Sequence, residues 1–374
     1  MPTTRKSATS KDTPIGFGII GCGVIAPTHR DAIDAVPGAK LVACCDIVEA
    51  KAKAFAEASK GNVRAYRRIE DMLRQDDVQA VCVCTPSGLH GEHAIMAMEA
   101  GKHVLCEKPL DIRLDRIDQM IETSRRMDVR LAGVFQFRTY PSSKKVREAV
   151  RMGKLGKLVL GDCYQKYYRS HEYYASGDWR ATWALDGGGA LMNQGVHGID
   201  LLLYLMGDVR RVSAFARRLV RNIEVEDTAV AIVEFANGAV GVIEGTTSVT
   251  PGYGCTIEIS GDDGTIKLQT DKIVAWDVKG EEGAEVEGAA GKGTASDPTS
   301  GLTATGHIQH ISDLVAAIRE GRDPEIPGTE ARRAVEVIKA IYRSSREGGA
   351  PVELPLSYEE DGPGIEPSLA SSEW

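Results

Sequence analysis

Two groups of polar side chains in this sequence could act together on an alcohol. Lys108, within Glu107-Lys108-Pro109, can hydrogen-bond a hydroxyl and stabilise a developing alkoxide with its positive charge. His197 is the natural acceptor for the proton that leaves when an alcohol loses a hydride. Asn193 lies four residues before His197, so a helix would place both side chains on one face. These three residues predict acid–base chemistry on a hydroxyl group.

The helix that is expected to carry His197 has two further features. Asp200 comes three residues after His197 and is expected to lie near it on the same face. Gly195 and Gly198 each cost about 1 kcal/mol relative to alanine in a helix interior. Their presence indicates that another part of the chain approaches this helix closely.

A third motif predicts dinucleotide binding. Residues 21–26 match G-x-G-x-x-A between an apolar strand and a helix, which is the context that the motif requires. Gly21 permits the tight turn, Gly23 lets the backbone approach a pyrophosphate, and the following helix N-terminus receives the phosphates. Asp46 can accept hydrogen bonds from the adenosine ribose and would repel a 2′-phosphate, and no arginine follows it directly. The motif therefore predicts NAD in preference to NADP.

The first third of the chain alternates strand and helix patterns around these motifs. Strands are predicted at 15–20, 40–45, 63–66, 80–84, 103–106 and 130–135, and helices at 26–36, 51–59, 91–100 and 116–127. Apolar runs such as Ala80–Cys84 are typical of strands that are buried on both faces. This alternation predicts an α/β domain of the Rossmann type, with a doubly wound parallel sheet. Lys108 then follows the fifth strand, at the edge where such sheets bind ligands.

The remainder of the chain predicts a second, α+β domain. Strands are predicted at 158–168, 209–219, 228–235, 239–248, 255–260, 265–269 and 272–276, and helices at 190–206, 308–320 and 330–346. Glycine-rich turns between these strands favour a large, mostly antiparallel open sheet. Residues 280–300 are expected to form a surface loop.

These patterns divide the chain into two domains and two tails. We expect a flexible tail at 1–13, an NAD-binding domain at 14–138, a domain for substrate binding and oligomerisation at 139–356, and a tail at 357–374. The closing helices of the second domain could pack back on the first.

Composition excludes several classes of partner. The 374 residues carry a net charge of −8, so neither nucleic acid nor an anionic membrane is an expected partner. No apolar run reaches the roughly 18–20 residues that cross a bilayer, and the N-terminus lacks the apolar core of a signal peptide, so we expect a cytoplasmic protein. The eight cysteines lack zinc-finger spacing and are expected to be reduced thiols, with no metal site.

The motifs together resemble the glucose–fructose oxidoreductase / inositol dehydrogenase / MocA family. The resemblance is carried by GCGVIA at 21–26, Asp46, CTPSGLH at 84–90, EKP at 107–109 and GGGALMNQGVHGIDLL at 187–202. It covers about residues 14–355. It implies an NAD-dependent oxidoreductase whose catalytic lysine is Lys108 and whose proton-transferring histidine is His197. It also implies homodimers or homotetramers that form through the open sheet.

The motifs and the resemblance together imply the residues of each site. The expected cofactor-binding residues are Gly21, Gly23, Val24, Ile25, Asp46, Ile47, Thr85, Pro86, Ser87, His90, Glu107, Lys108, Gln136, Trp179 and Arg180. The expected substrate-binding residues are Lys108, Tyr167, Arg169, Arg180, Asn193 and His197.

Asn193 departs from the pattern of many family members, which carry aspartate at this position. An amide cannot stabilise an imidazolium as a carboxylate can, although it can still hydrogen-bond a hydroxyl. The sugar-nucleotide 3-dehydrogenases of the family look similar in having asparagine there. The departure therefore weakens an assignment as an inositol dehydrogenase more than it weakens catalysis.

The expected substrate is a sugar, a glycoside, a cyclitol or a sugar derivative. Seven aromatic side chains could cover the C–H face of a sugar ring or could pack the domain junction: Tyr164, Tyr167, Tyr168, Tyr173, Tyr174, Trp179 and Trp183. Arg169 and Arg180 could each hold a carboxylate or a phosphate.

Three functions remain open at this point. The first is a dehydrogenase that oxidises a secondary hydroxyl by hydride transfer. The second is an enzyme that recycles bound NAD in every turnover, with net elimination, epimerisation or sugar–sugar oxidoreduction. The third is a regulatory protein that senses NAD without catalysis, which would not need both Lys108 and His197.

Overall fold

The first sheet carries the dinucleotide motif. The computed structural model describes residues 13–281 and 304–356. Six parallel strands pair in the order β3-β2-β1-β4-β5-β6. Their bounds are β1 Ile15–Ile20, β2 Ala39–Cys45, β3 Arg64–Tyr66, β4 Ala80–Val83, β5 His103–Cys106 and β6 Leu131–Gly133. The predicted doubly wound sheet is confirmed, and its order places the carboxyl ends of β1 and β4 side by side at the switch point.

Helices cover both faces of this sheet, which explains why its strands are apolar throughout. The helices are α1 Ala26–Ala35, α2 Glu49–Glu57, α3 Ile69–Leu73, α4 His90–Glu99, α5 Leu114–Arg126 and α9 Ala304–Glu320, with a short turn η1 at Ser87–Leu89. One face packs against α1, α2 and α9, and the other packs against α4 and α5. The α3 helix, which is only five residues long, was not predicted.

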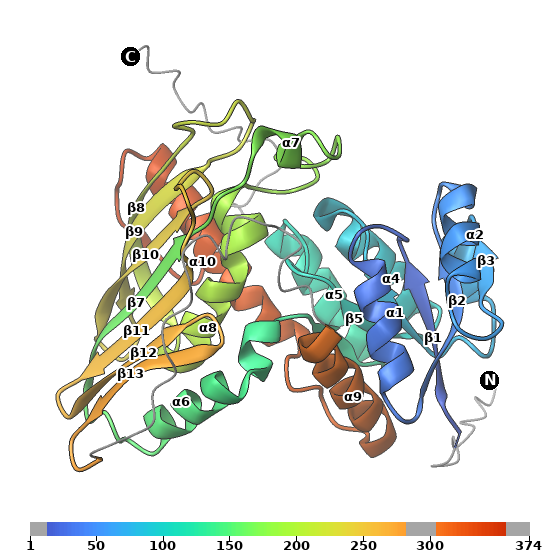
Figure 1. Cartoon of the computed structure of the whole chain (residues 1–374), viewed down its shortest axis with the longest axis horizontal. Helices are drawn as coiled ribbons and strands as arrows, with labels where there is room; N and C mark the ends of the chain where they lie inside the picture. The colour runs from blue at the N-terminus through green and yellow to red at the C-terminus, as the bar shows by residue number, and fades with distance from the viewer. Residues whose placement is uncertain (1–12, 282–303, 357–374) are drawn as a thin grey trace.

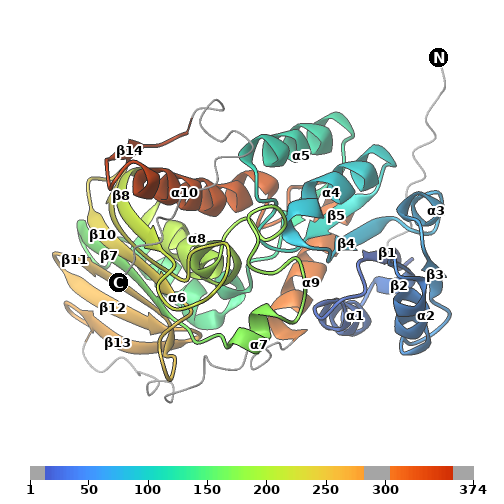
Figure 2. The same ribbon diagram turned by 90° about the horizontal axis from the view of Figure 1, so that it is seen from above.

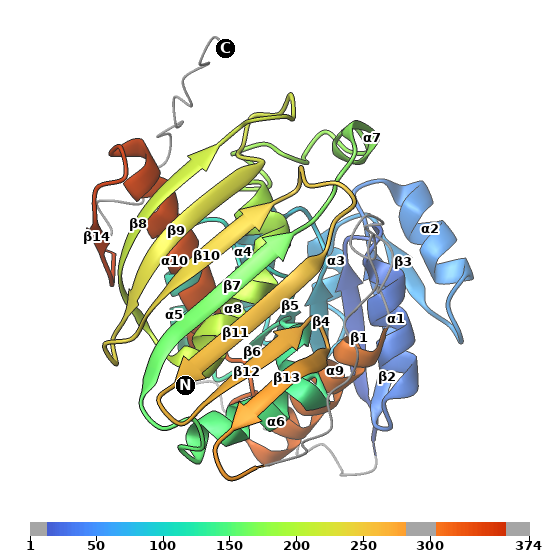
Figure 3. The ribbon, with the colours of Figure 1, turned by 60° about the vertical axis from the view of Figure 1, so that its left-hand side comes forward.

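The second sheet has eight strands in the order β13-β12-β11-β7-β10-β9-β8-β14. Their bounds are β7 Leu158–Lys166, β8 Val209–Arg217, β9 Thr228–Phe235, β10 Val240–Thr246, β11 Gly254–Gly261, β12 Gly264–Gln269, β13 Lys272–Val278 and β14 Val352–Glu353. All pairs are antiparallel except β10 with β7, which confirms the predicted open sheet. One face packs on helices while the other lies toward the viewer in Figure 3.

The helices of the second half lie between the two sheets. They are α6 Pro141–Arg151, α7 His171–Tyr174, α8 Val196–Met206 and α10 Gly328–Arg346, with a short turn η2 at Gln136–Thr139. The α6 helix was not predicted, although Pro141 at its start and buried Val146 and Ala149 fit an amphipathic helix.

The predicted helix over 190–206 needs a correction. Its first turn, η3 (Ala190–Gly195), is a π-helix, and only α8 is α-helical. Buried Glu226 accepts hydrogen bonds from the N–H groups of Gly189 and Leu191, which holds this first turn against the β9 end of the sheet. Such π-turns occur often at functional sites.

The α9 helix returns from the second half of the chain to the first sheet. It packs along α1, as Figures 1 and 2 show, and Arg319 near its end donates to the carbonyl of Thr13. The α10 helix contacts α5 and β6 as well as α8 and β8. Both closing helices therefore contact elements of the first sheet's layers, while the division into domains, with its boundary at residue 138, stays a prediction.

Two expectations from composition can be compared with the structure. All eight cysteines are free, and seven of them are buried. No helix in residues 13–281 or 304–356 combines the length and the hydropathy that crossing a bilayer requires. The predicted loop at 280–300 lies almost wholly outside the described residues, as do the tail at 357–374 and nearly all of the tail at 1–13.

Candidate active site

The loop between β1 and α1 has the shape that a dinucleotide needs. Gly21 has a φ of +92°, and a Cβ there would lie 2.8 Å from the carbonyl oxygen of Cys84. A Cβ on Gly23 would meet nothing within 4 Å, so the space in front of this glycine is open. Val24 and Ile47 are apolar yet 68% and 81% exposed on either side of the loop. Exposed apolar side chains at this place can cover an adenine ring.

Asp46 lies at the end of β2 and faces this loop. Its carboxylate accepts the N–H of Cys22 at 2.9 Å and the N–H of Val48 at 2.8 Å. These two bonds orient the carboxylate at the strand end, where the ribose hydroxyls of a dinucleotide bind. The residues present therefore fit NAD, and the role of Asp46 as the ribose acceptor stays a prediction.

Glu107 is buried between two histidines. Its Oε1 lies 2.8 Å from Nε2 of His29 on α1 and 3.0 Å from Nε2 of His307 on α9. Its Oε2 accepts the N–H of Lys108. Burial alone would raise the pKa of this carboxyl, but the two histidines outweigh burial and hold it well below its usual range. Glu107 is thus an ionised anchor for Lys108, and the sequence analysis missed both histidines because nothing in their spacing links residues 29, 107 and 307.

The same three side chains could hold a metal ion, since their ligand atoms lie within 4.8 Å of one another. Both nitrogen–oxygen separations are hydrogen-bond distances, however. They are shorter than the roughly 3.3 Å between neighbouring ligands around tetrahedral zinc with 2.0–2.1 Å bonds. The geometry favours a hydrogen-bonded group, and the absence of a metal stays a prediction.

Lys108 joins the two halves of the site. Its Nζ donates to the backbone carbonyl of Asn193 at 2.9 Å, so the end of the first sheet meets the π-turn directly. Burial lowers the pKa of Lys108, while the carboxylates of Glu107 and Asp186 oppose that change. The structure therefore brings together Lys108 and Asn193, which the sequence placed in different domains.

The side chain of Asn193 belongs to a partly buried hydrogen-bonded network. Its Nδ2 donates to Asp186 at 2.5 Å, and its Oδ1 accepts from Nε2 of Gln194. The Oε1 of Gln194 accepts a hydrogen bond from Arg169, and its Nε2 also donates to the hydroxyl of Tyr173. Arg180 donates to the same hydroxyl. Asp186 and Gln194 were not predicted, although Asp186 directly precedes the motif at 187–202 and Gln194 lies within it.

His197 is buried against two aromatic rings. Phe135 and Phe137 lie 5.9 Å and 5.3 Å from it between ring centroids, and its Nδ1 has no hydrogen-bond partner among the described residues. Burial, with the nearby Lys108 ammonium as the next cause, holds the pKa of His197 well below its usual value. The ring is therefore neutral at physiological pH, which is the form that can accept a proton.

Asp200 lies three residues after His197 on α8, and its carboxylate forms a buried bidentate ion pair with Arg138, at 2.7 Å and 2.6 Å. The side chain is fully buried, and α8 turns it toward η2. Asp200 anchors α8 to the chain segment that follows the first sheet.

The CTPSGLH segment contains one residue that is not placed as predicted. The ring nitrogens of His90 lie 2.7 Å from the carbonyl of Pro109 and 2.8 Å from that of Thr85, so neither is available to a cofactor. Thr85 lies beside Gly21, and Ser87 is buried. Gln136 has a buried Oε1 without a hydrogen-bond partner among the described residues, which a bound ligand could satisfy. Roles for Thr85, Pro86, Ser87 and Gln136 in cofactor binding stay predictions.

The aromatic residues divide between the site and the packing around it. Tyr173 and Trp179 lie against the Arg180 guanidinium, at 4.6 Å and 4.7 Å from ring centroid to Cζ, and Tyr167 lies under that of Arg169. Trp183 is used in packing, because its Nε1 donates to Glu224 and its ring meets Tyr342 edge-on.

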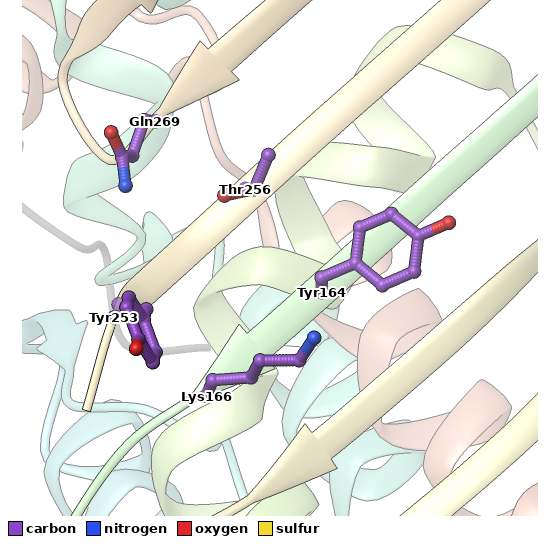
Figure 4. A pocket seen from close by; sticks show the side chains of 6 residues that line it. Tyr164, Lys166, Tyr253, Thr256 and Gln269 are labelled. Carbon is purple, nitrogen blue, oxygen red and sulfur yellow. The ribbon is translucent and has the colours of Figure 1, made fainter. Parts of the chain in front are cut away.

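Tyr164 lies on the opposite face of the second sheet from α8. Figure 4 shows it beside Lys166 on β7, near Thr256 of β11. Together with Tyr253, Gly254 and Gln269 these residues line an open hollow of about 350 Å³. Tyr164 therefore does not belong to the candidate active site.

Comparisons with known proteins agree with this geometry. Residues 15–135 match the family described as "Oxidoreductase family, NAD-binding Rossmann fold", and residues 143–267 match the "GFO/IDH/MocA C-terminal domain". The myo-inositol 2-dehydrogenase of Thermotoga maritima is 28% identical over 88% of this chain and 96% of its own length. The D-glucoside 3-dehydrogenase of Escherichia coli is 31% identical over 63% of this chain and 70% of its own.

One solved structure is similar over nearly the whole chain. The WlbA dehydrogenase of Bordetella pertussis, in complex with NADH and UDP-GlcNAcA, superposes with a TM-score of 0.81. It is 33% identical, and the match covers 92% of this chain and all of that one.

Proposed function

The chain belongs to the glucose–fructose oxidoreductase / inositol dehydrogenase / MocA family and is an NAD-dependent oxidoreductase of sugar-type alcohols, and from that premise we propose a specific reaction. The protein oxidises a secondary hydroxyl of a sugar derivative, with His197 as the proton acceptor and Lys108 as the group that polarises the oxygen. The contact between Lys108 and the π-turn that precedes His197 carries this proposal.

The neutral imidazole of His197 and the ammonium group of Lys108 have complementary roles in the proposed reaction. His197 is neutral because it is buried, so it can take the proton of the hydroxyl. Lys108, held between Glu107 and the Asn193 carbonyl, donates a hydrogen bond to the same oxygen and stabilises the charge that develops on it. NAD, when bound at the loop of Gly21 and Gly23, supplies the hydride acceptor.

Charge in the site favours a substrate with an anionic group. Lys108, Arg169 and Arg180 lie close enough for both guanidinium groups to lower the pKa of Lys108. Neither Lys108 nor Arg180 forms an ion pair with a carboxylate in the described part of the chain. A uronic acid or a sugar phosphate would bring the negative charge that this cluster of cations attracts. The WlbA dehydrogenase structure, which is a complex with UDP-GlcNAcA, supports the same class.

A substrate screen tests this function. Formation of NADH is followed at 340 nm with neutral pyranoses, glycosides, cyclitols, uronic acids, sugar phosphates and nucleotide-linked uronic acids. We expect turnover with sugar derivatives and the highest kcat/KM among anionic ones. Failure of every class would contradict the proposal, and loss of substrate without accumulation of NADH would favour the recycling of bound NAD instead.

Replacing Lys108 tests its role separately. We expect Lys108→Ala to lower kcat by about 100-fold or more, the scale for loss of a group that stabilises transition-state charge. NAD binding, measured by fluorescence titration, should stay within a few-fold of the wild type. Lys145→Ala on α6 is the matched control, because its ammonium lies over Trp276 away from the site. Unchanged kcat in Lys108→Ala would remove this lysine from the mechanism.

A further inference from the structure

Asp186 is a buried carboxylate whose two oxygens are both used inside the site. Its Oδ1 accepts from Nδ2 of Asn193, and its Oδ2 accepts from the backbone N–H of Ala181 at 2.8 Å. Ala181 has a φ of +55°, which is uncommon for a residue other than glycine, and this conformation accompanies its hydrogen bond to Asp186. The side chain of Asp186 is only 2% exposed, so solvent does not satisfy it.

We propose that Asp186 is a positioning residue for the dehydrogenase reaction, which orients the Asn193 amide and keeps Lys108 as an ammonium group. The inference rests on the proposed function for the roles of Asn193 and Lys108. The proposal also accounts for the asparagine at position 193. Asp186, seven residues earlier in the chain, supplies the carboxylate that an aspartate at position 193 would otherwise supply.

The orientation follows from donor and acceptor chemistry. An ionised carboxylate can only accept, so the Asn193 amide must turn its NH₂ group toward Asp186. A guanidinium can only donate, so Gln194 must turn its oxygen toward Arg169 and its NH₂ group toward Asn193. Both amides between Arg169 and Asp186 therefore have one allowed orientation, and the remaining hydrogen of the Asn193 amide is available to a substrate oxygen.

The charge of Asp186 also acts on Lys108. Burial lowers the pKa of Lys108, and Asp186 and Glu107 are the two carboxylates that raise it again. Arg169 and Arg180 act in the opposite direction, and His197 faces the same ammonium from α8. Burial raises the pKa of Asp186, and the hydrogen bonds from Asn193 and Ala181, followed by the charges of Lys108 and Arg180, oppose that change.

The test is Asp186→Asn, which keeps the shape and removes the charge. We expect kcat to fall by about tenfold, the scale of one hydrogen bond to a charged group. The alkaline limb of the kcat/KM profile should move to lower pH, because Lys108 loses a carboxylate that favours its protonated form. The pKa of Lys108 is also read without turnover, by NMR of ¹³C-lysine-labelled protein in which Lys108→Met identifies the resonance, and it should fall in Asp186→Asn.

The control variant is Glu226→Gln. Glu226 is likewise a buried carboxylate that binds the start of η3, but it touches neither Asn193 nor Lys108. Glu226→Gln should leave the alkaline limb of the kcat/KM profile and the pKa read from the Lys108 resonance unchanged, even if it lowers the melting temperature. An unshifted Lys108 pKa in Asp186→Asn would overturn the proposal even if kcat falls.

A second variant keeps the proposal testable if Asp186→Asn does not fold. The exchange Asp186→Asn with Asn193→Asp retains one carboxylate and one amide in contact. We expect it to fold and to bring the Lys108 pKa back to the wild-type value or above it. A folded exchange variant that binds NADH but has a lowered Lys108 pKa would contradict the inference. Absence of dehydrogenase activity in the wild type would instead contradict the proposed function, since the NMR titration needs no turnover.

Discussion

Protonation in this site is decided residue by residue through burial and local partners. His29, His90, His197 and His310 are all buried, and burial is the first cause that lowers the pKa of each ring. For Glu107 the local partners prevail over burial. Burial raises the pKa of this carboxyl, but the imidazoles of His29 and His307 lower it further and keep the group ionised. The site thus combines a neutral imidazole at His197 with a fixed negative charge only one residue away from Lys108.

The pH dependence of oxidation follows from His197. Because its pKa in the folded protein lies below the usual value near 6.5, the ring stays neutral, and kcat/KM should hold its plateau as the pH falls through 6.5. Activity should then be lost at lower pH, as the ring takes up a proton. Protonation also affects stability, because the histidine of the unfolded chain binds a proton more tightly than buried His197 does. The contribution of His197 to the free energy of unfolding therefore declines as the pH falls below about 6.5. An acid limb centred above pH 6.5, or one that persists in His197→Gln, would argue against this assignment.

Cofactor choice is also a single-residue property. We expect Asp46→Ala to weaken NAD binding by about tenfold, because the ribose loses a charged acceptor. NADP binding should weaken less or improve, because a 2′-phosphate no longer meets a carboxylate. Glu49→Ala is the control, since that exposed carboxylate pairs with Lys53 on the surface of α2. Equal losses for both nucleotides in a calorimetric titration would refute the ribose role of Asp46.

At the scale of elements, the position of α8 depends on its glycines. A Cβ on Gly198 would lie 2.4 Å from Oε1 of Gln165 on β7 and 2.8 Å from Sγ of Cys255 on β11. A Cβ on Gly195 would lie 3.0 Å from Nε2 of the same Gln165. The close approach that the sequence indicated is therefore the contact of this helix with the sheet, and it sets the distance between the sheet and the helix that carries His197.

This contact makes Gly198→Ala destabilising despite the helix propensity of alanine. Overpacking should lower the free energy of unfolding by about 1–3 kcal/mol, which outweighs the gain of about 1 kcal/mol from propensity. Adding Gln165→Ala removes the obstructing side chain and should make Gly198→Ala less costly than it is alone, as measured by urea denaturation. Additive effects of the two substitutions would show that Gln165 is not the obstacle.

At the scale of the whole molecule, the site exists only where the two halves meet. Lys108 comes from the end of β5, His197 from α8 beneath the second sheet, and His307 from a helix that returns to the first sheet late in the chain. Gly88 donates its N–H to the carbonyl of Leu185, which ties the two halves together near Asp186. Relative movement of the halves would separate Lys108 from the π-turn that precedes His197.

The outer face of the second sheet should bind a second copy of the chain. Phe215, Val230, Ile232 and Val240 are between 44% and 65% exposed on adjacent strands, which is a large apolar patch for a free surface. We expect Ile232→Glu to shift the wild-type oligomer toward smaller species in analytical ultracentrifugation. Met152→Glu, at an exposed site beyond α6, should leave the oligomer intact. A monomeric wild type would contradict the prediction.

The sequence alone determined the features that depend on local pattern. Strand and helix periodicity, the glycine loop and Asp46 predicted the first sheet and its ligand edge, and the alternation in the second half predicted the open sheet. These signals are local because backbone geometry and burial repeat every two or 3.6 residues.

Tertiary structure decided which distant side chains share one site. It placed His29 and His307 on Glu107, paired Asp200 with Arg138, and brought Asp186 to Asn193. Sequence spacing carries no information about contacts between residues 29, 107 and 307, because those contacts arise only when separate helices pack around a common sheet. The π-turn at η3 likewise results from the buried Glu226, which lies more than thirty residues away along the chain.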